Sequence, residues 1–189
     1  MRSYRRSLLL IFLLVAAVIV LFKPAARLFY PLAYRDTVFS YAQANGLDPL
    51  LVMAVMRTES KFYPLAVSAT GARGLMQLMP ETAQWVAARL KIEFQPERLF
   101  EPEFNLLLGT WYLAYLLREF NGNLGAALAA YNGGKENVKE WLQSGVWSGS
   151  PADLQKIPFS ETREFVYQVL RDYRVYRLLY PEFRSGSSM

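Results

Sequence analysis

Apolar residues recur along most of the chain at the three- and four-residue spacing of an amphipathic helix, and no long stretch alternates apolar and polar positions. The clearest helix begins at Asp48 and Pro49, because an N-cap aspartate followed by proline is a strong start signal, and it should run to Glu59. A shorter helix from Asp36 should end at Gly46. The other predicted helices span residues 80–90, 102–120, 124–131, 136–143 and 160–180. The pattern therefore predicts a mainly α-helical domain.

Two segments interrupt this pattern. Between Ser60 and Gly74 the helical period fails and Pro64 and Gly71 appear, which predicts an irregular loop or a small hairpin. Residues 144–158 are rich in Gly, Ser and Pro, and we expect a mobile connection there.

The N-terminus has the pattern of an export or anchoring signal. Arginines precede fifteen residues, 8–22, that carry no charge, and Lys23 and Pro24 close the run. This run is shorter than the ~20 residues of a typical spanning helix and overlaps the length of a signal-peptide core. We favour an uncleaved anchor because the small pair Ala16 and Ala17 lies inside the apolar run. A cleaved signal peptide and a buried helix of a soluble protein are the alternatives.

Three parts of the chain follow from this interpretation. Residues 1–27 are expected to form a membrane anchor or uncleaved signal segment, residues 28–183 the folded domain, and residues 184–189 a short polar tail. The N-terminal arginines favour a single-pass topology with the folded domain on the extracytoplasmic side. If the segment were cleaved, the domain would be secreted.

Composition excludes several chemistries. The 189 residues include no His and no Cys, which removes the usual general base, zinc ligand and thiolate nucleophile. We therefore expect no metal and no cofactor. The formal net charge of +5 suits an anionic partner, but the basic residues are scattered rather than clustered, so nucleic acid is not an expected partner.

Glu59 continues an apolar helix face. Leu51, Val55 and Glu59 follow one another at four-residue spacing, so the carboxyl group should be buried near the helix C-terminus. Burial and the negative end of the helix dipole both favour its protonated form, which suits a general acid that protonates a glycosidic oxygen. The alternative is a glutamate that turns to solvent or pairs with Arg57 or Lys61.

The sequence after Glu59 adds a dense motif. Residues 59–83 read ESKFYPLAVSATGARGLMQLMPETA, and the later segments GTWYL at 109–113, AYNGG at 130–134 and ETR at 161–163 continue the pattern. In these segments the chain strongly resembles the lytic transglycosylase family, over roughly residues 36–180. The resemblance implies a lysozyme-like helical fold with a glycan-binding groove. That family commonly has alanine where Gly133 stands, and we expect glycine there to loosen the turn.

The resemblance also implies roles for particular residues. Glu59 would be the catalytic acid that then acts as base. The implied substrate-binding residues are Ser68, Gln77, Met79, Tyr131, Asn132 and Glu161.

Each implied role has a physical interpretation beside a structural alternative. Ser68 could bond the N-acetyl carbonyl or hold Glu59, or it could cap its own loop. Tyr131 could aim its hydroxyl at Glu59, or pack as a buried ring. For Met79 the alternative is core packing, and for Glu161 it is stabilisation of the first turn of a helix.

The motif supplies one carboxylate, whereas a standard glycosidase uses two. We infer that the N-acetyl carbonyl of N-acetylmuramic acid stabilises the cationic centre and that the C6 hydroxyl attacks the anomeric carbon, giving a 1,6-anhydromuramic end. The predicted partners are therefore peptidoglycan glycan strands and the membrane. One rival is a hydrolytic muramidase that uses Glu161 or Glu101 as base. Another is a non-catalytic peptidoglycan-binding scaffold.

Overall fold

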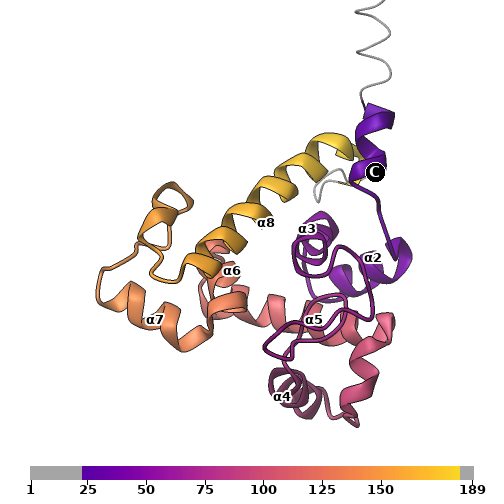
Figure 1. The fold of residues 1–189 in the computed structure, drawn as a ribbon, viewed down its shortest axis with the longest axis horizontal. Coiled ribbons are helices and arrows are strands. Elements are labelled where there is room, and N and C mark those ends of the chain that lie inside the picture. The colour runs from indigo at the N-terminus through magenta and orange to yellow at the C-terminus, as the bar shows by residue number, and fades with distance from the viewer. Residues whose placement is uncertain (1–22, 184–189) are drawn as a thin grey trace, which may run out of the picture.

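A computed structural model describes residues 23–183 of the chain (Figure 1). Within this range the fold is built from helices, with isolated β-bridges only. Residues 23–29 are helical. The α-helices that follow are α2 (Arg35–Ala44), α3 (Pro49–Glu59), α4 (Pro80–Leu90), α5 (Pro102–Glu119), α6 (Leu124–Gly133), α7 (Lys135–Gln143) and α8 (Ser160–Leu179). Short 3-10 helices are η1 (Pro96–Phe100), η2 (Pro151–Lys156) and η3 (Pro181–Phe183). The predicted fold class, mainly α, is confirmed.

Helix α3 lies at the centre of the main core. Its residues from Leu50 to Met56 are all buried, as expected for a helix covered on every side. The Asp48 side chain accepts a hydrogen bond of 2.9 Å from the backbone N–H of Leu50, and its other oxygen accepts one of 2.7 Å from the Tyr173 hydroxyl. The predicted helix start is confirmed, and the same residue fixes α3 to α8.

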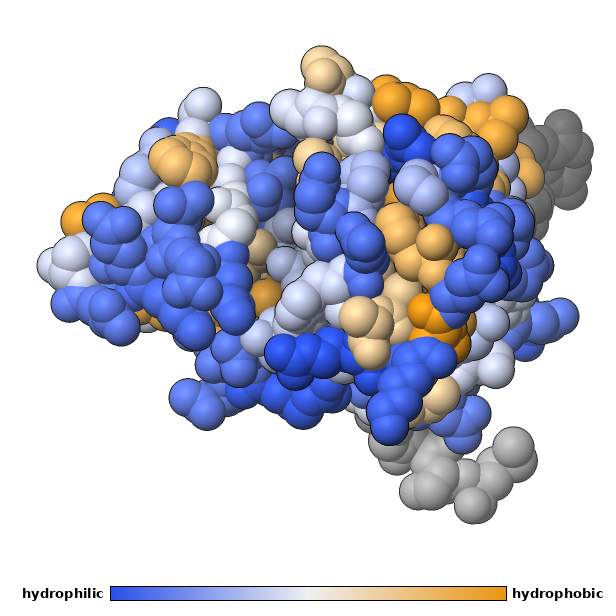
Figure 2. All heavy atoms as spheres, turned by 90° about the horizontal axis from the view of Figure 1, so that it is seen from below, coloured by the Kyte–Doolittle hydropathy of each residue, from blue (hydrophilic) through white to orange (hydrophobic). Residues whose placement is uncertain are grey.

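Helix α8 runs along one side of the molecule beside α3 and α6, while α4 and α5 lie on the other side (Figure 1). A second, smaller core joins α4, η1 and α5 through Leu78, Val86, Leu99, Phe104 and Leu108. Viewed from below, the surface is mostly hydrophilic and its hydrophobic residues gather in separate patches (Figure 2). The burial of the apolar helix faces therefore accounts for the fold.

The loop after Glu59 is held from beneath by Asn105. This fully buried side chain accepts a 2.8 Å hydrogen bond from the N–H of Met76 and donates to the carbonyls of Arg73 and Leu99, each at 2.9 Å. Gly74 has φ +77°, and a Cβ there would overlap the Asn105 amide and the Leu99 carbonyl. Antiparallel bridges at Arg73 give the loop the form of a small hairpin, which is one of the two predicted forms.

The connection over residues 144–158 differs from the mobile segment that we expected. It contains η2, and the Trp147 ring is 1% exposed. The Trp147 N–H donates to the Trp141 carbonyl at 3.2 Å, and its indole N–H donates to the Ser150 carbonyl at 3.3 Å. The Gly, Ser and Pro content of this segment predicted mobility and gave no sign that the buried Trp147 ring fixes it to the domain. Helix η1 was also missed, because its five residues are too few to show a period.

The predicted anchor lies mainly outside the described residues, as does the tail over residues 184–189. Between residues 23 and 183, no helix combines the length and apolar character needed to cross a membrane.

Candidate active site

Glu59 is the last residue of α3 and lies where the helix leaves the core. Leu51 and Val55, which precede it on the same face, are 4% and 0% exposed, whereas the Glu59 side chain is half-buried and reaches a groove. The predicted face is therefore correct, but its last member borders solvent instead of lying inside the core.

The groove has a volume of about 620 Å³ and brings the predicted site residues together. Its predicted members are Glu59, Ser68, Gln77, Met79, Tyr131, Asn132 and Glu161. Five segments that are distant in sequence contribute them: the end of α3, the hairpin, the start of α4, the end of α6 and the start of α8. The sequence analysis did not name as groove residues seven others that also line it: Thr70, Ala72, Gly133, Pro158, Phe159, Ser160 and Thr162. Most of these stand inside or beside the quoted motifs, and that position was the available signal.

Burial raises the pKa of the Glu59 carboxyl from its usual 4.5 to about 8; the negative charge of Glu161 adds to this effect and Lys61 opposes it. Within residues 23–183, Glu59 forms no ion pair. Arg57 instead pairs with Asp172 at 3.1 Å, and the Lys61 ammonium donates to the Arg57 carbonyl at 2.8 Å. The arrangement therefore keeps Glu59 protonated at neutral pH, as a general acid requires.

The Tyr131 hydroxyl has a different partner from the predicted one. It donates to the Met76 carbonyl at 2.8 Å, and its ring stacks on Phe165 with centroids 6.2 Å apart. Of the two interpretations offered for Tyr131, a hydroxyl aimed at Glu59 or a packed ring, the structure shows the ring stacked and the hydroxyl proton given to Met76 instead of Glu59. The hydroxyl oxygen keeps its capacity to accept. Burial, followed by the nearby Glu59, raises the pKa of Tyr131 well above its usual value, so the hydroxyl stays neutral and fixes the hairpin to α6.

Ser68 and Gln77 shape the hairpin wall of the groove. Ser68 Oγ accepts from the Ala72 N–H at 3.0 Å and bonds the Thr70 hydroxyl at 2.9 Å, so it caps its own loop and forms no bond to Glu59. Gln77 has φ +46°, and its amide nitrogen donates to the carbonyls of Ala66 and Gly74 at 3.1 and 2.9 Å. Within the described part of the chain its amide oxygen has no partner, so it can accept from a ligand.

The opposite wall is formed by the ends of α6 and α8. The hydroxyl of the buried Thr162 donates to Asn132 Oδ1 at 2.8 Å. A Cβ on Gly133 would come within 2.7 Å of the Thr162 oxygen. Gly133 is the last residue of α6 and is absent from the residues with positive φ, so it does not loosen a turn as expected; it gives Thr162 room to reach Asn132.

Three further predicted residues take clear positions. Met79 is the N-cap of α4 and partly exposed, so it does not pack in the core. Glu161 is exposed in the first turn of α8, where it both lines the groove and lies at the favourable end of the helix dipole. Glu101 lies outside the groove and pairs with Arg98 at 3.1 Å.

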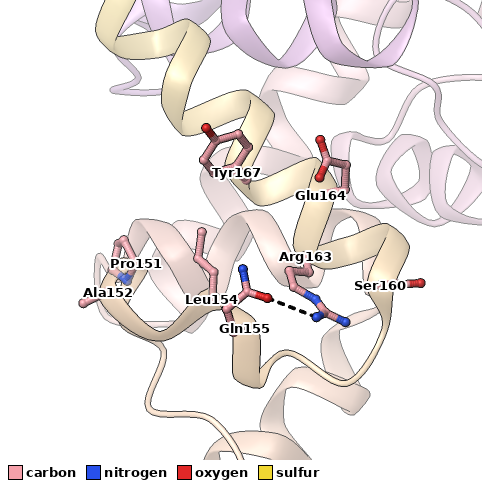
Figure 3. A pocket seen from close by; sticks show the side chains of 8 residues that line it. All are labelled: Pro151, Ala152, Leu154, Gln155, Ser160, Arg163, Glu164 and Tyr167. Atoms are coloured by element: carbon pink, nitrogen blue, oxygen red, sulfur yellow. Dashed lines mark hydrogen bonds between the residues drawn. The ribbon is translucent and has the colours of Figure 1, made fainter.

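A second cavity, of about 530 Å³, meets the groove at Ser160 and lies between η2 and the start of α8 (Figure 3). Arg163 extends between these two elements, and its guanidinium donates to the Gln155 side chain at 3.3 Å. The two cavities therefore share Ser160, at the start of α8, as a lining residue.

Comparison with known proteins places this site in a family. The model of the transglycosylase SLT domain matches residues 36–150. The soluble lytic murein transglycosylase of Salmonella typhimurium is 39% identical over 151 residues, which are 78% of this chain and 23% of that protein. Membrane-bound lytic murein transglycosylase C of Edwardsiella ictaluri is 35% identical in an alignment of 166 residues that covers 76% of this chain and 46% of that protein. This chain thus spans less than half the length of either relative.

Solved structures agree with these relatives. The lytic transglycosylase Slt of Pseudomonas aeruginosa, solved as an inactive glutamate-to-glutamine mutant, is 36% identical with a TM-score of 0.73, covering 80% of this chain and 25% of that one. The 70-kDa soluble lytic transglycosylase of Escherichia coli is 34% identical with a TM-score of 0.74, covering 84% and 26%. Because the family model matches more than half of its length, this chain belongs to the transglycosylase SLT domain family.

Proposed function

We propose that this chain is a peptidoglycan lytic transglycosylase. It cleaves the β-1,4 bond between N-acetylmuramic acid and N-acetylglucosamine and leaves 1,6-anhydromuramic ends. The observation that carries this proposal is the state of Glu59. This half-buried residue has no cationic partner in the described chain, and its pKa is about 8. It lies in a groove lined by hydrogen-bonding side chains. Relatives with 35–39% identity that are named lytic murein transglycosylases support it.

In the first half of the reaction, Glu59 gives its proton to the O4 oxygen of the departing N-acetylglucosamine. The bond from this oxygen to C1 of the muramic residue breaks, and the N-acetyl carbonyl of that residue stabilises the positive charge at C1. The negative charge of Glu161 favours the protonated Glu59 from which this step starts.

In the second half, the ionised Glu59 removes the proton from the muramic C6 hydroxyl. The O6 oxygen then forms a bond to C1, which closes the anhydro ring and returns Glu59 to its protonated state. Because Glu161 disfavours the ionised form of Glu59, it also makes that form a stronger base. No water is consumed.

We further propose how the groove binds a glycan strand. The free amide oxygen of Gln77 and the amide of Asn132 would bond sugar hydroxyl and N-acetyl groups. The Ser68 hydroxyl and the thioether of Met79 would contact the sugar, and Glu161 would contact the strand or its peptide. Tyr131 would act by holding the hairpin through the Met76 carbonyl.

We also propose that the apolar segment of residues 8–22 is a single-pass anchor that places the domain on the extracytoplasmic side. The uncharged run between the N-terminal arginines and Lys23 supports this. Relatives include proteins named soluble and membrane-bound, so both fates occur among them. Sequencing the N-terminus of the mature chain in the membrane fraction tests it: a start beyond residue 22, with the chain released from the membrane, would show cleavage and secretion.

The catalytic proposal is tested by mass spectrometry of the muropeptides that the purified full chain releases from sacculi. Anhydromuramic ends are expected, and Glu59→Gln should release at least about 10²- to 10⁴-fold less of them. Reducing ends would instead indicate the hydrolytic muramidase, with Glu161 as base, since Glu161 is the second carboxylate in the groove. Binding to sacculi without release of any fragment would indicate the non-catalytic scaffold.

A further inference from the structure

The most exposed large hydrophobic side chains of residues 23–183 lie near the start of this range and at the end of α8. Leu28, Phe29 and Leu178 are 81%, 71% and 65% exposed. The helix of residues 23–29 lies beside the C-terminal end of α8 (Figure 1), and the Arg27 guanidinium donates to the Leu179 carbonyl at 2.6 Å. These side chains therefore occupy one end of the molecule.

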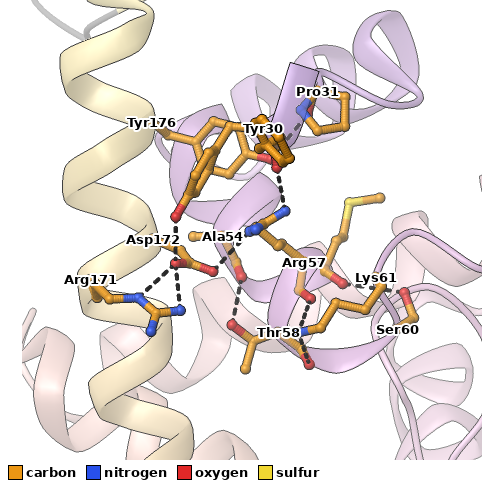
Figure 4. A network of polar contacts seen from close by, with 12 residues as sticks. Tyr30, Pro31, Ala54, Arg57, Thr58, Ser60, Lys61, Arg171, Asp172 and Tyr176 are labelled. Atoms are coloured by element: carbon orange, nitrogen blue, oxygen red, sulfur yellow. Dashed lines mark hydrogen bonds and ion pairs between the residues drawn. The ribbon is translucent and has the colours of Figure 1, made fainter. Parts of the chain in front are cut away.

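The segment that carries Leu28 and Phe29 is fixed to the domain through its backbone. The Arg57 guanidinium donates to the Phe29 carbonyl at 2.6 Å, and the Tyr180 hydroxyl donates to the Tyr30 carbonyl at 2.8 Å. The Tyr176 hydroxyl donates to the Pro31 carbonyl at 3.0 Å (Figure 4). Polar backbone groups are thus satisfied by the protein while apolar side chains are left exposed. That distribution is unfavourable toward water and favourable toward an apolar or interfacial surrounding.

The charge at this end is positive. Arg171 and Arg174 are exposed and share a helix face with Leu178, because they precede it by seven and four residues. The acidic groups nearby are already engaged: Asp172 is 2% exposed and bonds Arg57 and Arg171, and Glu182 pairs with Arg27 at 2.8 Å. We call Leu28, Phe29, Leu178, Arg171 and Arg174 the α8 end face.

We propose that the α8 end face rests on the surface of a lipid bilayer that contains anionic headgroups. Leucine and phenylalanine would enter the interfacial region while Arg174 bonds lipid phosphates, joined by the Arg171 guanidinium nitrogen that does not bond Asp172, the combination that favours interfacial binding. This inference rests on the proposed anchor, because Leu28 and Phe29 of the face follow the apolar residues 8–22 closely in sequence.

Contact at this face would fix the orientation of the domain relative to the bilayer. Helix α8 carries the end face at its C-terminal end and Glu161 of the groove at its N-terminal end. At 1.5 Å per residue, Leu178 and Glu161 are separated by about 26 Å along the helix axis. The groove is thereby set at a fixed offset from the bilayer surface.

Because the chain has no Cys, single labels can test this contact in the full-length protein. Leu178→Cys carries an environment-sensitive fluorophore, and Val146→Cys, at a side chain 47% exposed in the turn after α7, is the matched control. The protein is inserted into vesicles of phosphatidylcholine with phosphatidylglycerol, and headgroup-region spin-labelled lipid is the quencher. We expect at least threefold stronger quenching at position 178 than at 146. Equal quenching at the two positions would overturn the proposal.

Two variants sharpen the result. Leu28→Ser with Phe29→Ser keeps the backbone hydrogen bonds and should lower the quenching at position 178 at least twofold. Replacing phosphatidylglycerol by phosphatidylcholine should also lower it, because it removes the anionic headgroups. Disulfide formation between two Leu178→Cys chains without lipid quenching would assign the face to a second copy and overturn the proposal.

The proposed anchor and the proposed lipid contact of the α8 end face can fail separately, and the measurements distinguish the two cases. Vesicle flotation reports attachment to the bilayer by any route, so a chain that does not float contradicts the anchor and this inference together. A chain that floats without quenching at position 178 contradicts this inference alone. Muropeptide release from sacculi reports the catalytic proposal independently of both.

Discussion

Two carboxyl groups beside the interface of α3 and α8 have opposite surroundings. Asp172 is 2% exposed and is bonded by Arg57 at 3.1 Å and by Arg171 at 2.9 Å. Glu59 lies two residues after Arg57 on α3, yet no cation pairs with it in the described chain, and Glu161 adds a like charge nearby. The last turn of α3 thus carries both Arg57, which pairs with Asp172, and Glu59, which has no paired cation in the described chain.

This difference separates a structural acid from a chemical one. When a buried carboxylate is bonded by two guanidinium groups, removal of one partner leaves a buried charge uncompensated, so the group serves the fold. A carboxyl group that is desolvated without a cation keeps its proton to higher pH. The raised pKa of Glu59 therefore goes with the lack of a paired cation, since Arg57, two residues earlier, is bonded to Asp172.

The largest effect is expected when Glu59, the acid without a paired cation, is replaced. Glu59→Gln should lower the turnover of sacculi by at least about 10²- to 10⁴-fold, the usual contribution of a general acid. Turbidity clearance and released muropeptides measure this loss. Glu101→Gln, outside the groove, is the matched control and should retain full activity. Comparable losses in the two variants would show that the effect is not local to Glu59.

Replacing the paired acid should affect stability more than chemistry. Asp172→Asn leaves Arg57 and Arg171 without their carboxylate, and we expect a loss of roughly 2–3 kcal/mol, below the value for fully buried pairs because both arginines are partly exposed. Urea unfolding measures this change. The control is again Glu101→Gln, whose exposed pair with Arg98 should contribute less than about 1 kcal/mol. Unchanged stability of Asp172→Asn would contradict the structural role.

The pH dependence should follow the charge of Glu161. Activity should decline as pH rises through about 8, where Glu59 loses its proton. Glu161→Gln removes the like charge, so the pKa of Glu59 falls and the alkaline limb of the kcat profile moves to lower pH. A profile that keeps its alkaline limb in this variant would separate Glu161 from the titration of Glu59, even if KM rises through lost substrate contacts.

The free energy of unfolding should also depend on pH through Glu59. Because the pKa of Glu59 is higher in the folded state than the 4.5 of an exposed carboxyl, the folded chain binds more protons between about pH 4.5 and 8. The contribution of Glu59 to stability therefore falls as pH rises through this window. Relative to the native chain, Glu59→Gln should gain stability between pH 5 and 9, as measured by the difference in Tm. A difference that is constant with pH would contradict the shift.

The smallest expected effect concerns the wall of the groove. Gly133→Ala places a methyl group against the Thr162 hydroxyl and should cost about 1 kcal/mol through overpacking. Thr162→Ala should remove most of that cost, so a double-mutant cycle by thermal unfolding should give a coupling of similar size. Additive effects would show that Gly133 does not make room for Thr162.

Much of this could be predicted from the sequence. The N-cap pair Asp48 and Pro49 and the helical spacing gave the helix boundaries to within about two residues, because those signals are local. The site residues that the motif implied all line one groove in the structure. The Tyr131 bond to the Met76 carbonyl and the burial of Trp147 could not be predicted, because each depends on partners brought together by packing. The engagement of Arg57 by Asp172 is of the same kind, since 115 positions separate the two residues.

The protonation of Glu59 at neutral pH can be observed by infrared difference spectroscopy of the native chain against Glu59→Gln between pH 5 and 10. We expect a protonated-carboxyl C=O band, present at pH 6 and 7, that disappears with a midpoint near pH 8. A carboxylate already ionised at pH 6 would contradict it.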